Sequence, residues 1–407
     1  MPGTATLLRP VATLVDGEHA AVFGAPGSGK TALVIDVVAE RVERRGYTTD
    51  EVLVLSATRA SATALRDELA VRLGVTTRGP LARTANSVAF QLVRAFTGEP
   101  VTLLTGAEHD QIVGELLEGG IRDGFGPAWP DPLTPEVRAL RGFRSELRDV
   151  MMRAVEHGVG ADDLARLGER AGRPEWVAAA AFLAEYAEVK EQLRPTQFDS
   201  AELGAFAAAI VRRSTVDPAA SAALGVLDRL RLIVVDDAQE ATEATAALLG
   251  AFAARGVAIV AFGDPDVASN GFRGGRPELL GSLGGVVGAP VRRIDLDTVH
   301  RGRPAIRELV RSVTAHIGTA LGGTHRAAVL AGLRDGDDGR ADAAGSVGRA
   351  DAQGSGVRTD SDPLAPVLGI EAVSHAAECQ AIAGLLRERH LLDGVPWSSM
   401  AVVVRSG

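Results

Sequence analysis

The chain has 407 residues, a formal net charge of −9 and 46% hydrophobic residues, which predicts two or three domains with ordinary buried cores. The negative charge excludes a uniformly basic nucleic-acid-binding domain. The single cysteine, Cys379, excludes an intramolecular disulfide and a cysteine-rich metal site, and we interpret it as a small filler side chain.

Apolar segments are too short to cross a membrane. No run approaches the roughly 18 residues that are needed to span a bilayer. Residues 1–14 lack the charged start and long apolar stretch of a secretory signal. We therefore expect a cytoplasmic protein that does not contact a membrane.

The N-terminal part of the chain alternates short apolar segments with helical patterns. Residues 18–23 are apolar and β-prone, and a glycine-rich loop separates them from residues 31–45, which have helical periodicity. The alternation continues through residues 51–55, 61–73 and 81–96. Strands that alternate with helices predict an α/β fold with a parallel, doubly wound sheet.

Between residues 106 and 194 the pattern changes to helices alone. Helical periodicity is present at residues 107–117, 135–157, 161–171 and 174–192. Strand character returns at residues 230–235 and 257–262. A purely helical block between strands of one sheet predicts an inserted subdomain.

The C-terminal part contains a segment with little apolar character. Residues 332–362 are rich in Gly, Asp, Ser and Arg, which predicts a disordered insertion. A helix is predicted at residues 374–389, and a final strand at residues 400–404.

The glycine-rich loop fits the phosphate-binding pattern G-x-x-x-x-G-K-[ST] without a mismatch. Glycines let backbone N–H groups surround phosphates, and the N-terminus of the following helix adds a positive dipole. Lys30 is expected to reach the β- and γ-phosphates of ATP or GTP, and Thr31 to ligate Mg²⁺. The predicted nucleotide-binding residues are Gly24, Ala25, Pro26, Gly27, Ser28, Gly29, Lys30 and Thr31.

Two carboxylates follow the strand predicted at residues 230–235. Asp236 and Asp237 come at its C-terminal end, which is where open parallel sheets bind ligands. We expect Asp236 to hold Mg²⁺ opposite Thr31, Asp237 to activate the attacking water, and Gln239 to contact the γ-phosphate. An acidic corner without catalytic function is the alternative interpretation.

Several further segments resemble superfamily 1 helicases of the UvrD/Rep/PcrA and RecB kind. Residues 52–69 resemble their motif Ia, residues 83–87 motif Ib, residues 263–274 motif III and residues 296–301 motif IV. Residues 378–405 are similar to a segment early in the second RecA-like domain of that family. The matches to motifs Ia and IV argue against an unrelated P-loop kinase or AAA protein.

The resemblance implies ATP and Mg²⁺ as cofactors and a single DNA strand as the ligand of the motor. Phe272 matches an aromatic residue that stacks on a base, although a core aromatic would leave the same pattern. Arg301 matches an arginine that reaches the γ-phosphate from the second domain. Arg273 matches the arginine of motif III, or is a surface residue. The remaining residues that the resemblance places on DNA are Ser56, Thr58, Arg59, Thr84 and Ser87.

The same resemblance implies a domain organisation. A RecA-like ATP-binding domain would comprise residues 1–104 and 197–290, with a helical insertion at residues 105–196. Residues 291–407 would begin a second RecA-like domain that carries the disordered insertion.

Within the family, residues 104–108, 143–148 and 175–177 look like the A subunits of actinobacterial AdnAB helicase–nucleases. That likeness implies 3′–5′ DNA unwinding or translocation in recombinational repair and double-strand-break resection. The implied partners are single-stranded DNA, duplex ends and a partner helicase–nuclease subunit.

The sequence departs from the family pattern at several positions. Asp237 replaces a glutamate, Val267 replaces the glutamine of motif III, and Ala85-Asn86 replace Phe-His in motif Ib. The adenine-reading glutamine has no equivalent, because the first glutamine is Gln91. These changes favour an alternative function, a weakly hydrolysing nucleotide-binding subunit that supports a partner motor. Since motifs V and VI are not found, we expect this chain to bind nucleotide but not to unwind DNA by itself.

Overall fold

The computed structural model describes residues 13–74, 79–193, 196–269, 274–318, 323–331, 357–359, 367 and 369–404. The chain forms two compact units. The first comprises Met1–Arg301 and Ile317–Ala331, and the second comprises Gly302–His316 and Gly332–Gly407. None of the helices in the described ranges has the length and apolar character that a membrane span requires.

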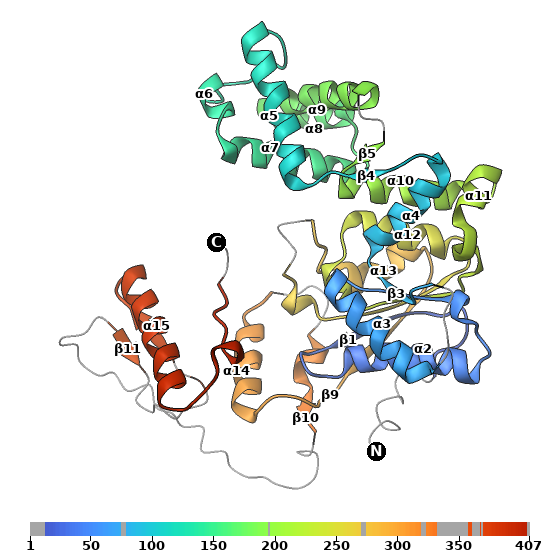
Figure 1. Cartoon of the computed structure of the whole chain (residues 1–407), viewed down its shortest axis with the longest axis vertical. Helices are drawn as coiled ribbons and strands as arrows, with labels where there is room; N and C mark the ends of the chain where they lie inside the picture. The colour runs from blue at the N-terminus through green and yellow to red at the C-terminus, as the bar shows by residue number, and fades with distance from the viewer. Residues whose placement is uncertain are drawn as a thin grey trace. The chain divides into compact units, whose positions relative to one another are not determined.

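A six-stranded parallel sheet lies within the first unit (Figure 1). Its strand order is β3-β2-β6-β7-β1-β8. Strands β2, β6 and β7 are buried along their whole length, as expected for a parallel sheet whose two faces are covered by helices. The structure therefore confirms the predicted α/β fold. The strands are β1 His19–Gly24, β2 Val52–Leu55, β3 Ala82–Arg83, β6 Leu232–Val235, β7 Ala258–Gly263 and β8 Val291–Leu296.

Helices cover both faces of this sheet and form two separate cores. Side chains alternate between the faces along a strand, so Phe23 joins one core whereas its neighbour Val22 joins the other. The Val22 face packs against α2 (Lys30–Arg44) and α3 (Arg59–Leu73). The Phe23 face packs against α4 Ala85–Thr97, α10 Ser200–Arg213, α11 Pro218–Leu224, α12 Glu243–Ala253 and α13 Leu279–Val287.

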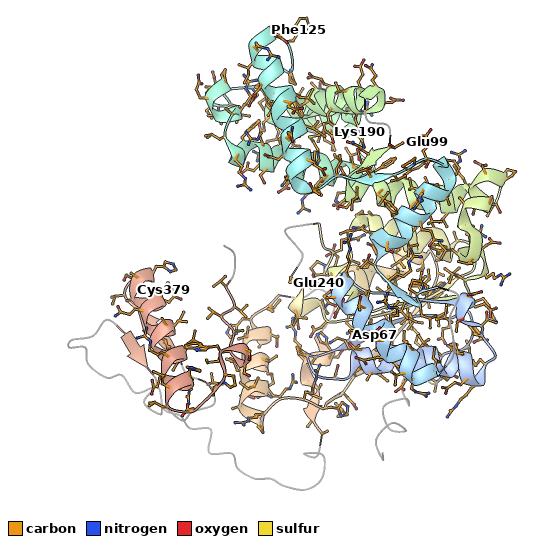
Figure 2. The ribbon with its side chains drawn as sticks, in the orientation of Figure 1. Asp67, Glu99, Phe125, Lys190, Glu240 and Cys379 are labelled. Carbon is orange, nitrogen blue, oxygen red and sulfur yellow. The ribbon has the colours of Figure 1, made fainter. Side chains whose placement is uncertain are left out.

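A block of helices is inserted between α4 and α10 and has its own hydrophobic core. At its base, β4 (Thr102–Leu103) pairs in parallel with β5 (Gln197–Phe198). Lys190, near the end of the block, forms an ion pair with Glu202 at the start of α10 (Figure 2). The helices of the block are α5 Gly106–Asp123, α6 Pro135–Arg138, α7 Arg141–Glu156, α8 Ala161–Ala171 and α9 Pro174–Leu193.

One predicted helix of the block is divided in the structure. The pattern at residues 135–157 predicted a continuous helix, but α6 ends at Arg138 and α7 begins at Arg141. Leu140 between them has an extended backbone, with φ −69° and ψ 139°. The guanidinium of Arg144 donates to the carbonyl oxygen of Ala139, 2.9 Å away, and so satisfies a backbone group at the break. Helical periodicity alone did not reveal this interruption.

The second unit contains α14 (Pro304–Ala315), the antiparallel pair β11 (Val357–Thr359) and β12 (Ile370–Ala372), and α15 (His375–Leu391). The predicted helix at residues 374–389 is therefore present. The strand predicted at residues 400–404 is not formed, and Val403 is 93% exposed. An apolar run makes a strand only beside a partner, and these residues pair with no strand in the described part of the chain.

Two further boundaries differ from the sequence interpretation. Residues 357–359 of the predicted disordered insertion form β11, while residues 332–356 and 360–362 lie outside the described residues. The proposed second domain was to begin at residue 291, but β8 pairs with β1 along the register from His19↔Val291 to Gly24↔Leu296. Residues 291–301 therefore belong to the first unit, because their backbone hydrogen bonds complete the first sheet.

Candidate nucleotide and strand-binding site

The glycine-rich loop joins β1 to α2 at the carboxyl edge of the sheet. Gly27 and Gly29 have φ values of 83° and 87°, in the left-handed region that side chains with a Cβ rarely adopt. A Cβ on Gly24 would lie 2.3 Å from Ser28 Oγ, so only glycine lets the loop fold back on itself. The loop leaves α2 with its first N–H groups free of a side-chain cap, which is the arrangement that binds phosphate.

Lys30 and Thr31, the first residues of α2, point toward the same edge. Lys30 Nζ donates to the carbonyl oxygens of Gly24 and Ala25, at 2.7 and 3.4 Å. Thr31 Oγ1 donates to Asp236 Oδ2 at 3.1 Å. Two motifs that are 205 residues apart in sequence therefore meet where β1 and β6 end at the carboxyl edge of the sheet.

Asp236 follows β6 directly and is 4% exposed. Burial and, next in size, the neighbouring charge of Asp237 raise the pKa of its carboxyl to about 6, although the hydrogen bond from Thr31 opposes them. Its second oxygen, Oδ1, has no hydrogen-bond partner among the described residues. A buried carboxylate oxygen without a donor is costly, and a cation there would remove the cost.

Asp237 and Gln239 shape the turn after Asp236. Asp237 is the described non-glycine residue with positive φ, at 55°, a strained conformation that clusters at functional sites. Gln239 Nε2 donates to Asp237 Oδ1 at 3.2 Å, and Gln239 Oε1 accepts from the Asp264 N–H at 3.0 Å. The buried amide of Gln239 thus ties the end of β6 to the end of β7 and fixes the Asp237 carboxylate.

Arg301 approaches the glycine loop from the residues after β8. The N–H of His300 donates to the carbonyl oxygen of Gly27 at 2.9 Å. A Cβ on Gly27 would lie 3.2 Å from the Arg301 Cβ, so the two backbones are in close contact. Arg301 is also close enough for its charge to lower the pKa of Lys30. The structure therefore brings Arg301 to the glycine loop.

A buried ion-pair cluster beside this site was not anticipated from the sequence. His325 Nε2 lies 3.2 Å from Asp264 Oδ1 and 3.2 Å from Asp266 Oδ2. Arg326 contacts both oxygens of Asp266, at 2.7 and 2.5 Å. Because Arg326 and His325 already occupy these oxygens, we interpret the cluster as an ion-pair network rather than a metal site. The motif III resemblance pointed to Asp264, but no sequence signal linked it to His325.

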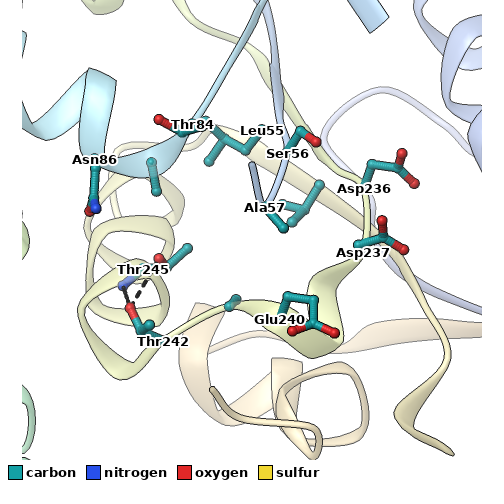
Figure 3. A pocket seen from close by; sticks show the side chains of 13 residues that line it. Leu55, Ser56, Ala57, Thr84, Asn86, Asp236, Asp237, Glu240, Thr242 and Thr245 are labelled. Atoms are coloured by element: carbon teal, nitrogen blue, oxygen red, sulfur yellow. Dashed lines mark hydrogen bonds between the residues drawn. The ribbon is translucent and has the colours of Figure 1, made fainter. Parts of the chain in front are cut away.

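The described residues that we expect to contact DNA follow β2 and β3. Ser56, Thr84, Asp236 and Asp237 line a cavity of about 130 Å³ (Figure 3). A larger groove of about 1110 Å³ runs from Asp237 past Thr58 to the helical block. Arg59, Thr84 and Ser87 line a neighbouring hollow of about 920 Å³, together with Arg83 and Arg94.

Several of these hydroxyls already have partners within the chain. Thr58 and Thr84 are the N-caps of α3 and α4 and accept from the N–H groups of Ser61 and Ser87, at 3.0 and 3.2 Å. Ser56 donates to Ser61 Oγ at 2.6 Å. These contacts set the helix N-termini at the groove edge, a position that favours an anionic backbone.

Motif III is described only in part. Val267, which replaces the expected glutamine, is 42% exposed at the end of a 3₁₀ turn (Pro265–Val267) and lines the larger groove. Phe272 and Arg273 lie outside the described residues, so their predicted roles remain predictions.

The site fits a magnesium nucleotide. Besides Asp236 Oδ1, the buried Ser28 Oγ has no partner among the described residues; the first atom belongs to the residue after β6 and the second to the glycine loop. The parallel sheet, the glycine loop, Lys30, Thr31 and the Asp236–Asp237 pair define a P-loop nucleotide-binding domain.

Comparison with known families gives the same class. The model of the UvrD/REP helicase N-terminal domain matches residues 8–284, which is more than half of the chain. The chain therefore belongs to the UvrD/Rep helicase family, whose domain is that of ATP-dependent DNA helicases. A comparison with curated proteins found none that matches this chain.

Proposed function

We propose that this chain is the ATP-hydrolysing portion of a motor that moves along single-stranded DNA. The observation that carries the proposal is the hydrogen bond between Thr31 and Asp236, at 3.1 Å, beside the free N-terminus of α2. It assembles a phosphate-binding loop and a buried carboxylate at one sheet edge. A groove leads from this edge toward the helical block, and DNA would occupy that groove.

Each residue of the site has a distinct part in the proposed reaction. A bound magnesium ion supplies charge neutralisation for the phosphates. Thr31 and Asp236 would hold the ion, while Lys30 would exchange its carbonyl partners for phosphate oxygens. Asp237 would accept a proton from the attacking water, with Gln239 fixing its orientation through their hydrogen bond.

Arg301 would neutralise charge that develops on the transferred phosphate, in the manner of an arginine finger. The glycine loop, Gly24, Ala25, Pro26, Gly27, Ser28 and Gly29, would bind the phosphates through its backbone N–H groups, which all of these residues except Pro26 possess. For the strand, we propose contacts from Ser56, Thr58, Arg59, Thr84, Ser87 and Phe272. Helix N-termini and arginines at the groove suit a phosphate backbone rather than one base sequence.

The wider context follows from family likeness. We propose that residues 1–104 and 197–301, which include β8, form the ATP-binding domain and residues 105–196 its helical insertion. A 3′–5′ polarity, a role in recombinational repair, and pairing with a second helicase–nuclease subunit rest on the likeness to the AdnA group.

A second candidate function, a weakly hydrolysing scaffold for a partner motor, has its own support. Asp237 is one methylene shorter than the family glutamate and is held by Gln239. A general base must come within about 2.6–3.2 Å of the water, which a shorter, tethered carboxylate reaches less readily. Val267 offers no polar atom to a phosphate.

The deciding experiment measures ATP turnover by this chain with and without oligo(dT). The motor requires that DNA stimulate hydrolysis, and Asp237→Glu should raise kcat by roughly tenfold if the short side chain limits water activation. The scaffold predicts nucleotide binding without DNA-dependent turnover. Lys30→Ala should abolish nucleotide binding in either case, and undiminished ATP affinity in that variant would overturn the site.

A further inference from the structure

Residues 323–331, called the strap below, pack against the glycine loop. Its strand β10 (Val329–Leu330) pairs in parallel with β9 (Thr298–Val299), and the Val329 N–H donates to the carbonyl oxygen of Asp297 at 2.9 Å. Ala328 packs with Val299 and with Ala25 of the glycine loop in a small buried cluster. The strap therefore rests on the nucleotide site although it is distant in sequence.

The other end of the strap is polar and buried. Arg326 contacts both carboxylate oxygens of Asp266 and also donates to the carbonyl oxygen of Ile317, at 3.1 Å. The His325 ring is 2% exposed, lies 6.0 Å from the Phe23 ring of β1, and contacts Asp264 and Asp266 through Nε2. Two successive strap residues thus fix both aspartates of the loop after β7.

Asp264 has two neighbours, His325 and Lys30, that could each pair with its carboxylate. Its Oδ1 accepts from the Asp266 N–H at 3.0 Å and lies against His325. Lys30 is also near Asp264, because Phe23 of β1 pairs with Gly263 of β7 and the next residue, Gly24, accepts from Lys30 Nζ at 2.7 Å. Burial lowers the pKa of the Lys30 ammonium, and among the charged neighbours Asp264 opposes that effect most. Yet the ammonium donates to the carbonyl oxygens of Gly24 and Ala25. The Asp264 carboxylate is therefore near Lys30, but its contacts are with His325 and the Asp266 N–H.

We propose that His325 and Arg326 are positioning residues that hold the Asp264 carboxylate away from Lys30, so that the ammonium stays available for a nucleotide phosphate. This inference rests on the proposed nucleotide binding at the glycine loop. Without the strap contacts, the Asp264 carboxylate would be free to form an ammonium–carboxylate pair with Lys30. A charge-assisted hydrogen bond of that kind competes directly with a phosphate oxygen for the same protons.

The physical reason for such a device lies in the burial of the site. A carboxylate as buried as Asp264, which is 1% exposed, must have a cationic or hydrogen-bonding partner. His325 and the Asp266 N–H provide those partners inside the loop. The Gly-Asp sequence of motif III can therefore follow β7 while Lys30 remains available to bind a phosphate.

The experiment measures the affinity of the chain for a fluorescent ADP analogue, at equilibrium and with magnesium. His325→Leu should weaken binding about tenfold, which corresponds to about 1.4 kcal/mol. Adding Asp264→Asn to that variant should restore most of the affinity, because an amide cannot hold the ammonium as a charge pair. A merely structural role for His325 predicts no such rescue. The control is Arg166→Ala, which removes an exposed Arg–Asp pair of α8.

Thermal unfolding of every variant accompanies the binding measurement. If His325→Leu does not fold, Arg326→Ala enters the same comparison, since Asp266 would then compete with Asp264 for His325. Unchanged affinity in a folded strap variant, or a double variant that binds no better than the single, would overturn the inference. Failure of the wild-type chain to bind the analogue would instead overturn the proposed function.

Discussion

The Asp236→Asn variant tests whether burial and a neighbouring charge destabilise the ionised form of the Asp236 carboxyl. Burial and Asp237 raise the pKa of the Asp236 carboxyl from its ordinary value of 3.8 to about 6 in the folded chain. Each pKa unit corresponds to about 1.36 kcal/mol, so ionised Asp236 costs the nucleotide-free protein about 3 kcal/mol at neutral pH. Asparagine has nearly the same shape and cannot ionise.

The sign of the effect follows from linkage. The folded pKa is raised, so the folded chain binds the proton more tightly than the unfolded chain does. The resulting stability is fully present below pH 3.8 and is lost as pH rises through about 6. The Asp236→Asn variant cannot ionise at this position, so it does not lose this stability as the pH rises. We therefore expect the free energy of unfolding of the variant, relative to wild type, to rise by about 2.4 kcal/mol between pH 4 and pH 7.5, because part of the effect is already lost at pH 4.

The assay is urea denaturation of the nucleotide-free chain, followed by far-ultraviolet circular dichroism across that pH range. The new amide places a group without a partner at the former Oδ1 position, which costs stability. This cost is the same at every pH, so it cancels when only the change with pH is compared. Asp237→Asn is the matched second variant: it removes the neighbouring charge and should shrink the pH-dependent difference. Parallel stability curves for wild type and Asp236→Asn would refute the assignment of a strained, buried carboxylate at this position.

Two predictions concern packing away from the nucleotide. Burial lowers the pKa of His109 to about 4, so the stability that its neutral form provides above pH 6.5 should be lost, by about 3 kcal/mol, as pH falls to 4. His109→Phe keeps the ring beside Tyr186, and urea denaturation at each pH should show that this acid loss has disappeared. A Cβ on Gly204 would lie 2.7 Å from the Ala244 Cβ, so Gly204→Ala should destabilise the chain by about 1–3 kcal/mol in thermal unfolding. Adding Ala244→Gly should recover most of that loss; no recovery would mean that α10 and α12 do not meet there.

Contiguous patterns were the part of the site that the sequence could predict. The conformation of the loop from Gly24 to Thr31 could be predicted from its sequence alone, because glycines at fixed spacing permit the left-handed backbone that phosphate binding needs. Asp236 could be placed opposite Thr31 because parallel strands end at one edge of the sheet. Both arguments use local chemistry and a general property of the fold, and neither requires a known tertiary contact.

Long-range pairing was the part that the sequence could not predict. His325 lies 59 residues beyond Asp266, and nothing in its surroundings distinguishes it from the other histidines. The β8 strand was missed because exposed Arg292 and Arg293 interrupt its apolar character. The break at Leu140 leaves helical periodicity on both sides. For His325 and β8, the deciding interaction joins residues that no pattern within a short window can connect.

The charges at the sheet edge explain why a chain with net charge −9 can bind a polyanion there. The carboxylates of Asp236, Asp237 and Asp264 and the guanidinium of Arg301 all act on Lys30. A free nucleotide would meet these carboxylates as well as the cations, and the buried setting gives little screening. In the proposed function, a magnesium ion held by Thr31 and Asp236 would reverse that balance, and the strap would remove Asp264 from competition. Affinity at this edge is therefore decided by which carboxylates are engaged, and the net charge of the chain has little bearing on it.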